Sequence, residues 1–155
     1  MIRPSPFQIQ GPLEDHTGTL GREADRPSAA LRLELERSVE APAIARAAAS
    51  GLCDDLDLGP SLRSTCLLLV SEIVSNAVLH SSAPLDEAIV FTASSGPDAV
   101  HVAVIDAGNG FSYPVGVPPS PGRGYGLYLV DKAAREWGID RVGGTRVWFE
   151  LARSA

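Results

Sequence analysis

Residues 60–80, PSLRSTCLLLVSEIVSNAVLH, form the longest regularly patterned stretch of the chain, and the rest of the sequence is interpreted outward from it. Pro60 suits the first turn of a helix and the turn-like SSAP that follows ends one, so the pattern predicts a helix over 60–80. Apolar residues cover most of its circumference and leave one narrow polar arc, which consists of Ser71, Glu72, Ser75 and Asn76. A solvated stripe is the alternative interpretation of this arc, but the largely apolar remainder of the helix weakens it.

Glu72 and Asn76 lie four positions apart on this predicted helix, so their side chains stand one above the other on the same face. A carboxylate can accept a proton from a nucleophile or orient it, and an amide oxygen is a hard ligand of the kind that Mg²⁺ prefers. The spacing therefore suits a site for a metal-bound nucleotide.

Regular elements are predicted on both sides of this helix. Before it, alternating leucines indicate a half-buried strand over 31–36, and the Ala-rich run 41–56 indicates a helix. After it, two strands over 88–95 and 98–106 are separated by Gly96 and Pro97, which is typical of a hairpin between antiparallel neighbours.

The C-terminal part completes the predicted fold. A third helix is expected over 127–138, ending at Gly138, and a closing hairpin is expected from strands over 139–142 and 145–151. The resulting order is β-α-α-β-β-loop-α-β-β. This order predicts the α/β class: an α+β two-layer sandwich with three helices on one face of a mixed, mostly antiparallel sheet.

The size of the chain fits one domain. It has 155 residues, 45% hydrophobic and 21% charged, which is ordinary for a globular protein with a single core. Residues 1–28 mix Pro, Gly and charge without a period, so they are predicted to be a flexible N-terminal tail that precedes a domain over 29–155. Cys53 and Cys66 lack metal-ligand spacing and are too few for a disulfide framework, which favours buried reduced thiols and argues against a structural zinc site.

Charge and hydropathy narrow the classes of partner. A formal net charge of -6 argues against a protein that binds the phosphate backbone, so nucleic acid is not an expected partner. The N-terminus has no apolar core typical of a signal peptide, and no stretch approaches the roughly 20 apolar residues of a membrane span. The expected location is therefore the cytoplasm, without a membrane partner.

Asp106 stands at the end of a predicted strand and is followed at once by Ala-Gly-Asn-Gly-Phe over 107–111. A carboxylate in this place can accept a hydrogen bond from an exocyclic amine, and glycines let a flat ring or a phosphate approach the backbone closely. The alternative is a plain turn in which the Asp caps and Gly supplies a positive φ.

The stretch 122–126, Gly-Arg-Gly-Tyr-Gly, lies directly before the third predicted helix. Its backbone N–H groups and the helix N-terminus can receive phosphate oxygens, with Arg123 as a further contribution. Mg²⁺ and backbone dipoles would then let an acidic protein bind a triphosphate. A flexible helix cap is the alternative for this stretch. Thr145, at the start of the last strand, could direct its hydroxyl to a base or a bridging water, or could be simply a β-branched strand residue.

The order of four motifs carries more information than any one of them. They are E-x-x-x-N-A-x-x-H over 72–80, D-x-G-x-G-F over 106–111, G-x-G-x-G-L over 122–127 and G-G-T-x-x-x-F-x-L over 143–151. In this order the sequence resembles the GHKL ATPase superfamily, which includes gyrase, histidine kinases and mismatch-repair ATPases. The resemblance covers about 31 to 151 and implies the Bergerat ATP-binding fold. The compact size and the opening strand with its Ala-rich helix look like the anti-sigma factor serine/threonine kinases.

The resemblance implies a role for each matching position. Glu72 would be the catalytic base toward a protein hydroxyl, and Asn76 would be the Mg²⁺ ligand. Asp106 would hold the adenine amine, with Gly108 and Gly110 packing under the base.

The remaining implied positions surround the phosphates and the base. Residues 112–121 would be the ATP lid, and Thr145 would support the adenine pocket. The third motif would bind the phosphates of the nucleotide through Gly122, Arg123, Gly124, Tyr125, Gly126 and Leu127.

The function implied is that of an ATP-dependent protein serine/threonine kinase. It would transfer the γ-phosphate of ATP to an anti-anti-sigma protein and control a sigma factor, and the family also implies homodimerisation. The alternative is a non-catalytic module of the same fold, in which ATP gates the binding of a protein partner. Four prolines in the predicted lid favour this alternative slightly because they restrict φ and stiffen the segment; they are Pro114, Pro118, Pro119 and Pro121.

Overall fold

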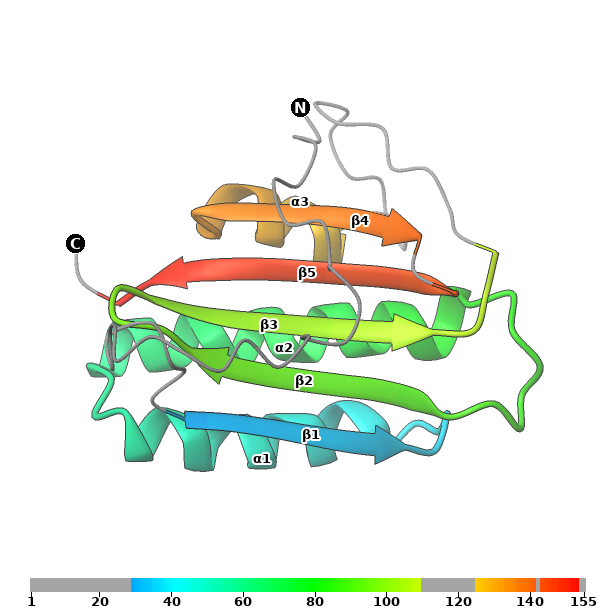
Figure 1. Cartoon of the computed structure of the whole chain (residues 1–155), viewed down its shortest axis with the longest axis horizontal. Helices are drawn as coiled ribbons and strands as arrows, with labels where there is room; N and C mark the ends of the chain where they lie inside the picture. The colour runs from blue at the N-terminus through cyan, green and yellow to red at the C-terminus, as the bar shows by residue number, and fades with distance from the viewer. Residues whose placement is uncertain (1–28, 110–124, 142, 154–155) are drawn as a thin grey trace, which may run out of the picture.

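The computed structural model describes residues 29–109, 125–141 and 143–153. Three helices and five strands lie in these residues, in the predicted order (Figure 1). Their bounds are β1 Ala29–Leu35, α1 Ala41–Asp55, α2 Pro60–His80, β2 Ile89–Ser95, β3 Ala99–Asp106, α3 Tyr125–Ala133, β4 Glu136–Arg141 and β5 Thr145–Ala152. The predicted tail 1–28 lies outside the described residues.

The five strands form one sheet in the order β1-β2-β3-β5-β4. All four pairs of neighbouring strands are antiparallel, whereas the sequence analysis expected a mixed sheet. The three helices form a second layer against one face of this sheet, with α2 packed between α1 and α3 (Figure 1). The predicted α/β two-layer sandwich is thus confirmed.

The core lies between the sheet and the helices. Strand register places one row of apolar side chains across all five strands, and this row consists of Leu33, Phe91, Val104, Val147 and Ile139. Because side chains alternate between the two faces of a strand, the whole row faces the same side. These residues pack in one cluster with the buried side chains of the helices, so a single core supports the domain.

Helix α2 is the central helix of the fold, and its bounds agree with the prediction. It buries Leu69, Val70, Ile73, Val74 and Ala77 against the sheet and the neighbouring helices. With 21 residues it is also long and apolar enough to cross a membrane by length and composition, although the sequence analysis expected no such stretch. Six of its side chains are buried in the core between the sheet and the helices.

Helix α3 is shorter than predicted. The sequence analysis extended it to Gly138, but it ends at Ala133 and the next residues begin β4. Strand pairing explains the difference, because Gly138 lies opposite Trp148 in the sheet. A Cβ on Gly138 would lie 2.8 Å from the indole Nε1 of Trp148, so this glycine makes room for a side chain on the neighbouring strand rather than ending a helix.

Cys53 and Cys66 are free thiols buried between α1 and α2, as the sequence analysis expected. A hydrogen bond from the Cys66 thiol lowers the pKa of Cys53 to about 7. Donation of that hydrogen bond, together with burial, raises the pKa of Cys66.

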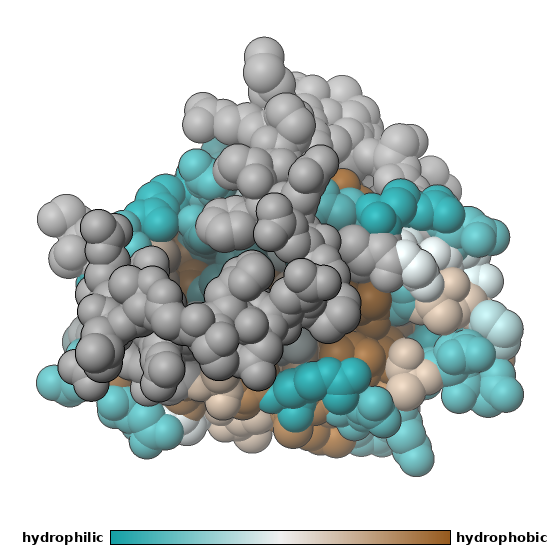
Figure 2. Space-filling model, in the orientation of Figure 1, coloured by the Kyte–Doolittle hydropathy of each residue, from teal (hydrophilic) through white to brown (hydrophobic). Residues whose placement is uncertain are grey.

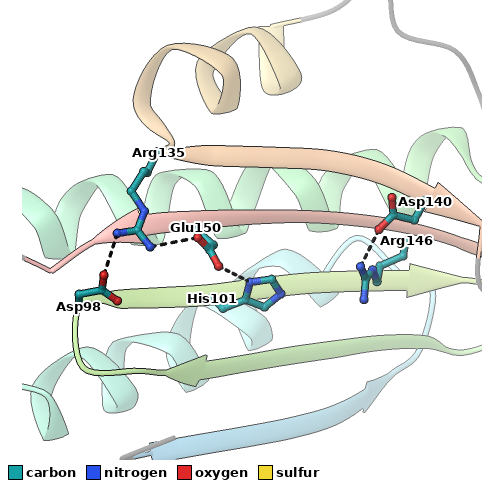
Figure 3. Close-up of polar contacts among 6 residues, drawn as sticks. All are labelled: Asp98, His101, Arg135, Asp140, Arg146 and Glu150. Carbon is teal, nitrogen blue, oxygen red and sulfur yellow. Dashed lines mark hydrogen bonds and ion pairs between the residues drawn. The ribbon is translucent and has the colours of Figure 1, made fainter. Parts of the chain in front are cut away.

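The sheet face turned away from the helices carries a network of ion pairs (Figure 3). Arg135 contacts Asp98 at 3.3 Å and Glu150 at 3.1 Å, and Glu150 contacts Nδ1 of His101 at 3.5 Å. Burial lowers the pKa of His101, and the neighbouring Glu150 opposes that shift. In the orientation of Figure 1, the hydrophilic residues of the coloured surface gather along the margin of the molecule, and hydrophobic residues lie between them (Figure 2).

Candidate functional site

The polar arc of α2 meets the first turn of α3. Glu72 and Asn76 are both half-buried, and Gly126 of α3 lies directly against them. A Cβ on Gly126 would lie 3.0 Å from Oε2 of Glu72 and 3.3 Å from Nδ2 of Asn76. The structure therefore brings three predicted site residues together beside the N-terminal turn of a helix, where backbone N–H groups and the helix dipole favour an anion.

Asp106 lies at the end of β3 with its carboxylate largely buried. Its Oδ1 accepts two hydrogen bonds, from the Gly108 N–H at 2.6 Å and from the Ser81 hydroxyl at 2.8 Å. Within the described part of the chain, nothing donates a hydrogen bond to Oδ2. One carboxylate oxygen is thus fixed by the protein, and the other is available to a donor on a ligand.

Gly108 packs more tightly than a turn residue needs to. A Cβ here would lie 2.6 Å from Oδ1 of Asp106 and 3.0 Å from the hydroxyl oxygens of Ser81 and Ser82. Gly108 does not need a positive φ, since among the described glycines that conformation belongs to Gly143, with φ 76°. Close approach therefore explains Gly108, and its contacts are these polar side chains. The alternative of a plain turn holds in part: Asp106 caps the turn by accepting from the N–H two residues on, but Gly108 does not supply a positive φ.

Thr145 is buried next to this turn and opposite Asp106 in the sheet. Its hydroxyl donates to the carbonyl oxygen of Gly108 at 3.1 Å. Gly144 touches the backbone carbonyl of Asp106 so closely that a side chain there would collide with it. Strand β5 thus holds the Asp106–Gly108 turn from the neighbouring position in the sheet.

Two features of this region were missed by the sequence analysis. Arg37, in the turn after β1, donates to the carbonyl oxygens of Val78, Ala83 and Ser81 at 3.0, 2.7 and 2.8 Å. Ser82 accepts from the backbone N–H of Asn109 at 2.8 Å. The serine pair after the helix was a visible signal, because Ser in turns bonds to nearby backbone. The Arg37 contacts gave no signal in the sequence, since they join residues more than 40 positions apart.

The remaining predicted site residues lie outside the described residues, in the core or at the surface. Gly110, Gly122, Arg123, Gly124 and the predicted lid 112–121 lie outside the described residues, as does the side chain of Tyr125. Leu127 is buried in the core cluster and so packs the fold. His80 is exposed at the last residue of α2.

A magnesium ion fits this site only as part of a metal–nucleotide complex. Within the described ranges, no group of three or more His, Cys, Asp or Glu side chains could hold a metal ion. Mg²⁺ is usually held by one or two protein oxygens together with substrate phosphates. Asn76 fits that pattern because its amide lies beside the N-terminal turn of α3.

The carboxylate of Asp106 and the Glu72–Asn76 pair lie toward the same end of α2. Ser81, which contacts Asp106, follows Asn76 by five residues, or about 7.5 Å of helix rise. The two groups of polar residues therefore lie within a few residues of each other along the C-terminal half of α2 and the segment that follows it.

Comparison with known proteins agrees with this geometry. The family model described as the histidine kinase-like ATPase domain matches residues 35–151. A crystal structure of the RsbU and RsbW domains of Rv1364c from Mycobacterium tuberculosis superposes with a TM-score of 0.64 at 23% identity, covering 83% of this chain and 34% of that one. This chain thus spans about a third of that protein's length, and the likeness shows a shared fold. No curated protein sequence matches significantly.

Proposed function

Because the chain belongs to the histidine kinase-like ATPase family, we propose that it is an ATP-binding anti-sigma regulatory protein with serine/threonine kinase activity. Its α/β sandwich is consistent with the GHKL ATPase fold, and that family implies ATP binding. The partners proposed are an anti-anti-sigma protein as phosphate acceptor and a sigma factor as the controlled protein. The RsbW domain named in the similar structure supports an anti-sigma role.

The observation that carries the proposal is the state of the Asp106 carboxylate. Its Oδ1 is held by two protein donors, and among the described residues none donates to Oδ2, which is left as an acceptor. The 6-amino group of adenine is a donor and matches this oxygen, whereas the 6-oxo group of guanine or hypoxanthine would place two acceptors together. For a purine that presents its position 6 to Oδ2, the geometry therefore favours ATP over GTP.

Glu72 is the residue proposed to act in phosphoryl transfer. The hydroxyl oxygen of a serine or threonine forms a bond to the γ-phosphorus, the bond to the β–γ bridging oxygen breaks, and ADP leaves. The Glu72 carboxylate accepts the hydroxyl proton. Its position beside the N-terminal turn of α3 supports this role, because the same turn offers N–H groups to the phosphates.

Calorimetric titration with ATP, in the presence and absence of Mg²⁺, tests the nucleotide half of the proposal. We expect binding that is stronger with Mg²⁺ and stronger for ATP than for GTP. Wild-type chain that binds neither nucleotide would overturn this half.

The kinase half is tested with purified anti-anti-sigma proteins of the source organism, Mg-ATP and mass spectrometry of the acceptor. Glu72→Gln is expected to abolish phosphate transfer and to leave ATP affinity within about threefold, because a base acts on the nucleophile and not on the nucleotide. Glu136→Gln is the matched control, since Glu136 is also half-buried but lies at the start of β4. If ATP promotes binding of the acceptor and no phosphate appears on it, a non-catalytic ATP-gated binding module replaces the kinase.

A further inference from the structure

The C-terminus of α2 is capped by an arginine from a distant part of the chain. All three nitrogens of the Arg37 guanidinium donate to backbone carbonyl oxygens, those of Val78, Ser81 and Ala83. The last carbonyls of a helix have no partner within the helix, and a cation there is also favoured by the helix dipole. Arg37 therefore fixes both the end of α2 and the segment that follows it.

That segment contacts the predicted base-recognition residue. The Ser81 hydroxyl oxygen accepts a hydrogen bond from the Ala83 N–H at 3.1 Å and donates its own proton to Oδ1 of Asp106 at 2.8 Å. The backbone carbonyl oxygens of the same two residues, Ser81 and Ala83, accept hydrogen bonds from Arg37. The guanidinium is thus connected to the Asp106 carboxylate through one serine.

We propose that Arg37 and Ser81 are positioning residues for recognition of the base. Arg37 holds the 81–83 segment, Ser81 holds Oδ1 of Asp106, and the carboxylate therefore presents Oδ2 to the 6-amino group of the nucleotide. This inference rests on the proposed function in one respect, that adenine binds at Asp106. No motif in the sequence assigns a role to Arg37 or Ser81.

The physical consequence is nucleotide selectivity. With Oδ1 held by two donors, the carboxylate is fixed in rotation and its free oxygen prefers a 6-amino donor over a 6-oxo acceptor. Without the serine hydroxyl, the Gly108 N–H is the one donor to Oδ1 that remains among residues 29–109, 125–141 and 143–153, and the carboxylate can turn toward water. Affinity for ATP then falls, while affinity for inosine triphosphate, which has no 6-amino group, changes little.

The test compares the affinities for ATP and inosine triphosphate by calorimetry, together with thermal unfolding. Ser81→Ala is expected to weaken ATP binding about tenfold, which is about 1.4 kcal/mol, because the carboxylate of Asp106 is then no longer held by the serine hydroxyl. Binding of inosine triphosphate is expected to change by less than about twofold, because that ligand makes no amine contact. Arg37→Ala is expected to act in the same direction, and Arg37→Lys to restore part of the selectivity, because Lys keeps the charge without the planar fork.

Arg153→Ala is the matched control. Arg153 is also half-buried and donates to a backbone carbonyl, that of Gly96 at 3.0 Å, but it lies at the opposite end of the sheet. Loss of folding weakens the binding of both nucleotides alike. The ratio of the two affinities therefore distinguishes an effect on the position of the carboxylate from an effect on stability. Unchanged selectivity in Ser81→Ala or in Arg37→Ala overturns the inference and leaves ATP binding standing. Wild-type chain that binds no ATP overturns the proposed function, and this inference with it.

Discussion

Substitution of Asp106 by Asn replaces the carboxylate oxygen Oδ2 with an NH₂ donor, and it preserves the two hydrogen bonds that Oδ1 accepts within the protein. The Asn Oδ1 can still accept from Gly108 and Ser81, which now hold Oδ1 of Asp106 at 2.6 and 2.8 Å. The amide nitrogen then occupies the position of Oδ2 and faces the 6-amino group of ATP. Loss of a hydrogen bond to a charged group costs about 1.5–3 kcal/mol, and an unpaired donor costs about 1–3 kcal/mol more. ATP binding should therefore weaken by about 100-fold or more.

The same variant should lose its preference for the 6-amino group, because its amide donor matches the 6-oxo group of inosine triphosphate. Calorimetry with both nucleotides measures this change, and circular dichroism checks that the fold is intact. Asp98→Asn is the matched control, since Asp98 lies at the opposite end of β3 and pairs with Arg135. ATP affinity within about threefold of wild type in the Asp106 variant would refute the reasoning, since the contact would then carry less than about 1 kcal/mol.

Three further predictions follow from side-chain contacts. Gly126→Ala places a Cβ about 3.0 Å from the flexible end of Glu72, so the phosphate-transfer rate should fall at least about tenfold, and more than ATP affinity does, in a comparison of single-turnover rates with calorimetry. Gly138→Ala pushes against the buried indole of Trp148 and should lower the free energy of unfolding by about 1–3 kcal/mol in urea titrations; an unchanged midpoint would contradict it. Burial holds the pKa of His101 below its ordinary value of 6.5, so the unfolded state binds more protons than the folded state in mildly acid solution. Stability should therefore decrease as pH falls from about 7 to 5, and less so in His101→Gln, as measured by unfolding at each pH.

The parts of the fold that the sequence predicted well are those with local signals. Both ends of α2 are marked in the sequence, by Pro60 and by the SSAP turn, and the helix has the predicted bounds. The end of α3 has no such mark. The sequence pattern did not separate residues 136–138 from the preceding helix, and their pairing with β5 makes them a strand. Long-range pairing of this kind cannot be inferred from the composition of one segment.

The site divides in the same way. Glu72 and Asn76 are four residues apart on one helix, so their common face follows from helix geometry. Asp106 and Thr145 were identified by motif, and the strand register places them opposite each other. Arg37 escaped detection because a turn arginine gives no sequence signal of bonding to carbonyls 41 to 46 residues away.

Asp106 is held by more hydrogen bonds within the protein than Glu72. This difference predicts that base binding and phosphoryl transfer respond differently to substitutions. Asp106 is held by its own strand, by Ser81 after α2 and by a turn that Thr145 fixes from β5. Three elements thus constrain this carboxylate, which favours a rigid recognition element. Glu72 has no such hydrogen-bond support from side chains in the described part of the chain, and Gly126 of α3 allows close approach to its carboxylate. Base recognition should therefore tolerate small changes in the packing of α3, whereas phosphoryl transfer, which depends on placing one carboxylate within hydrogen-bond reach of a hydroxyl, should not.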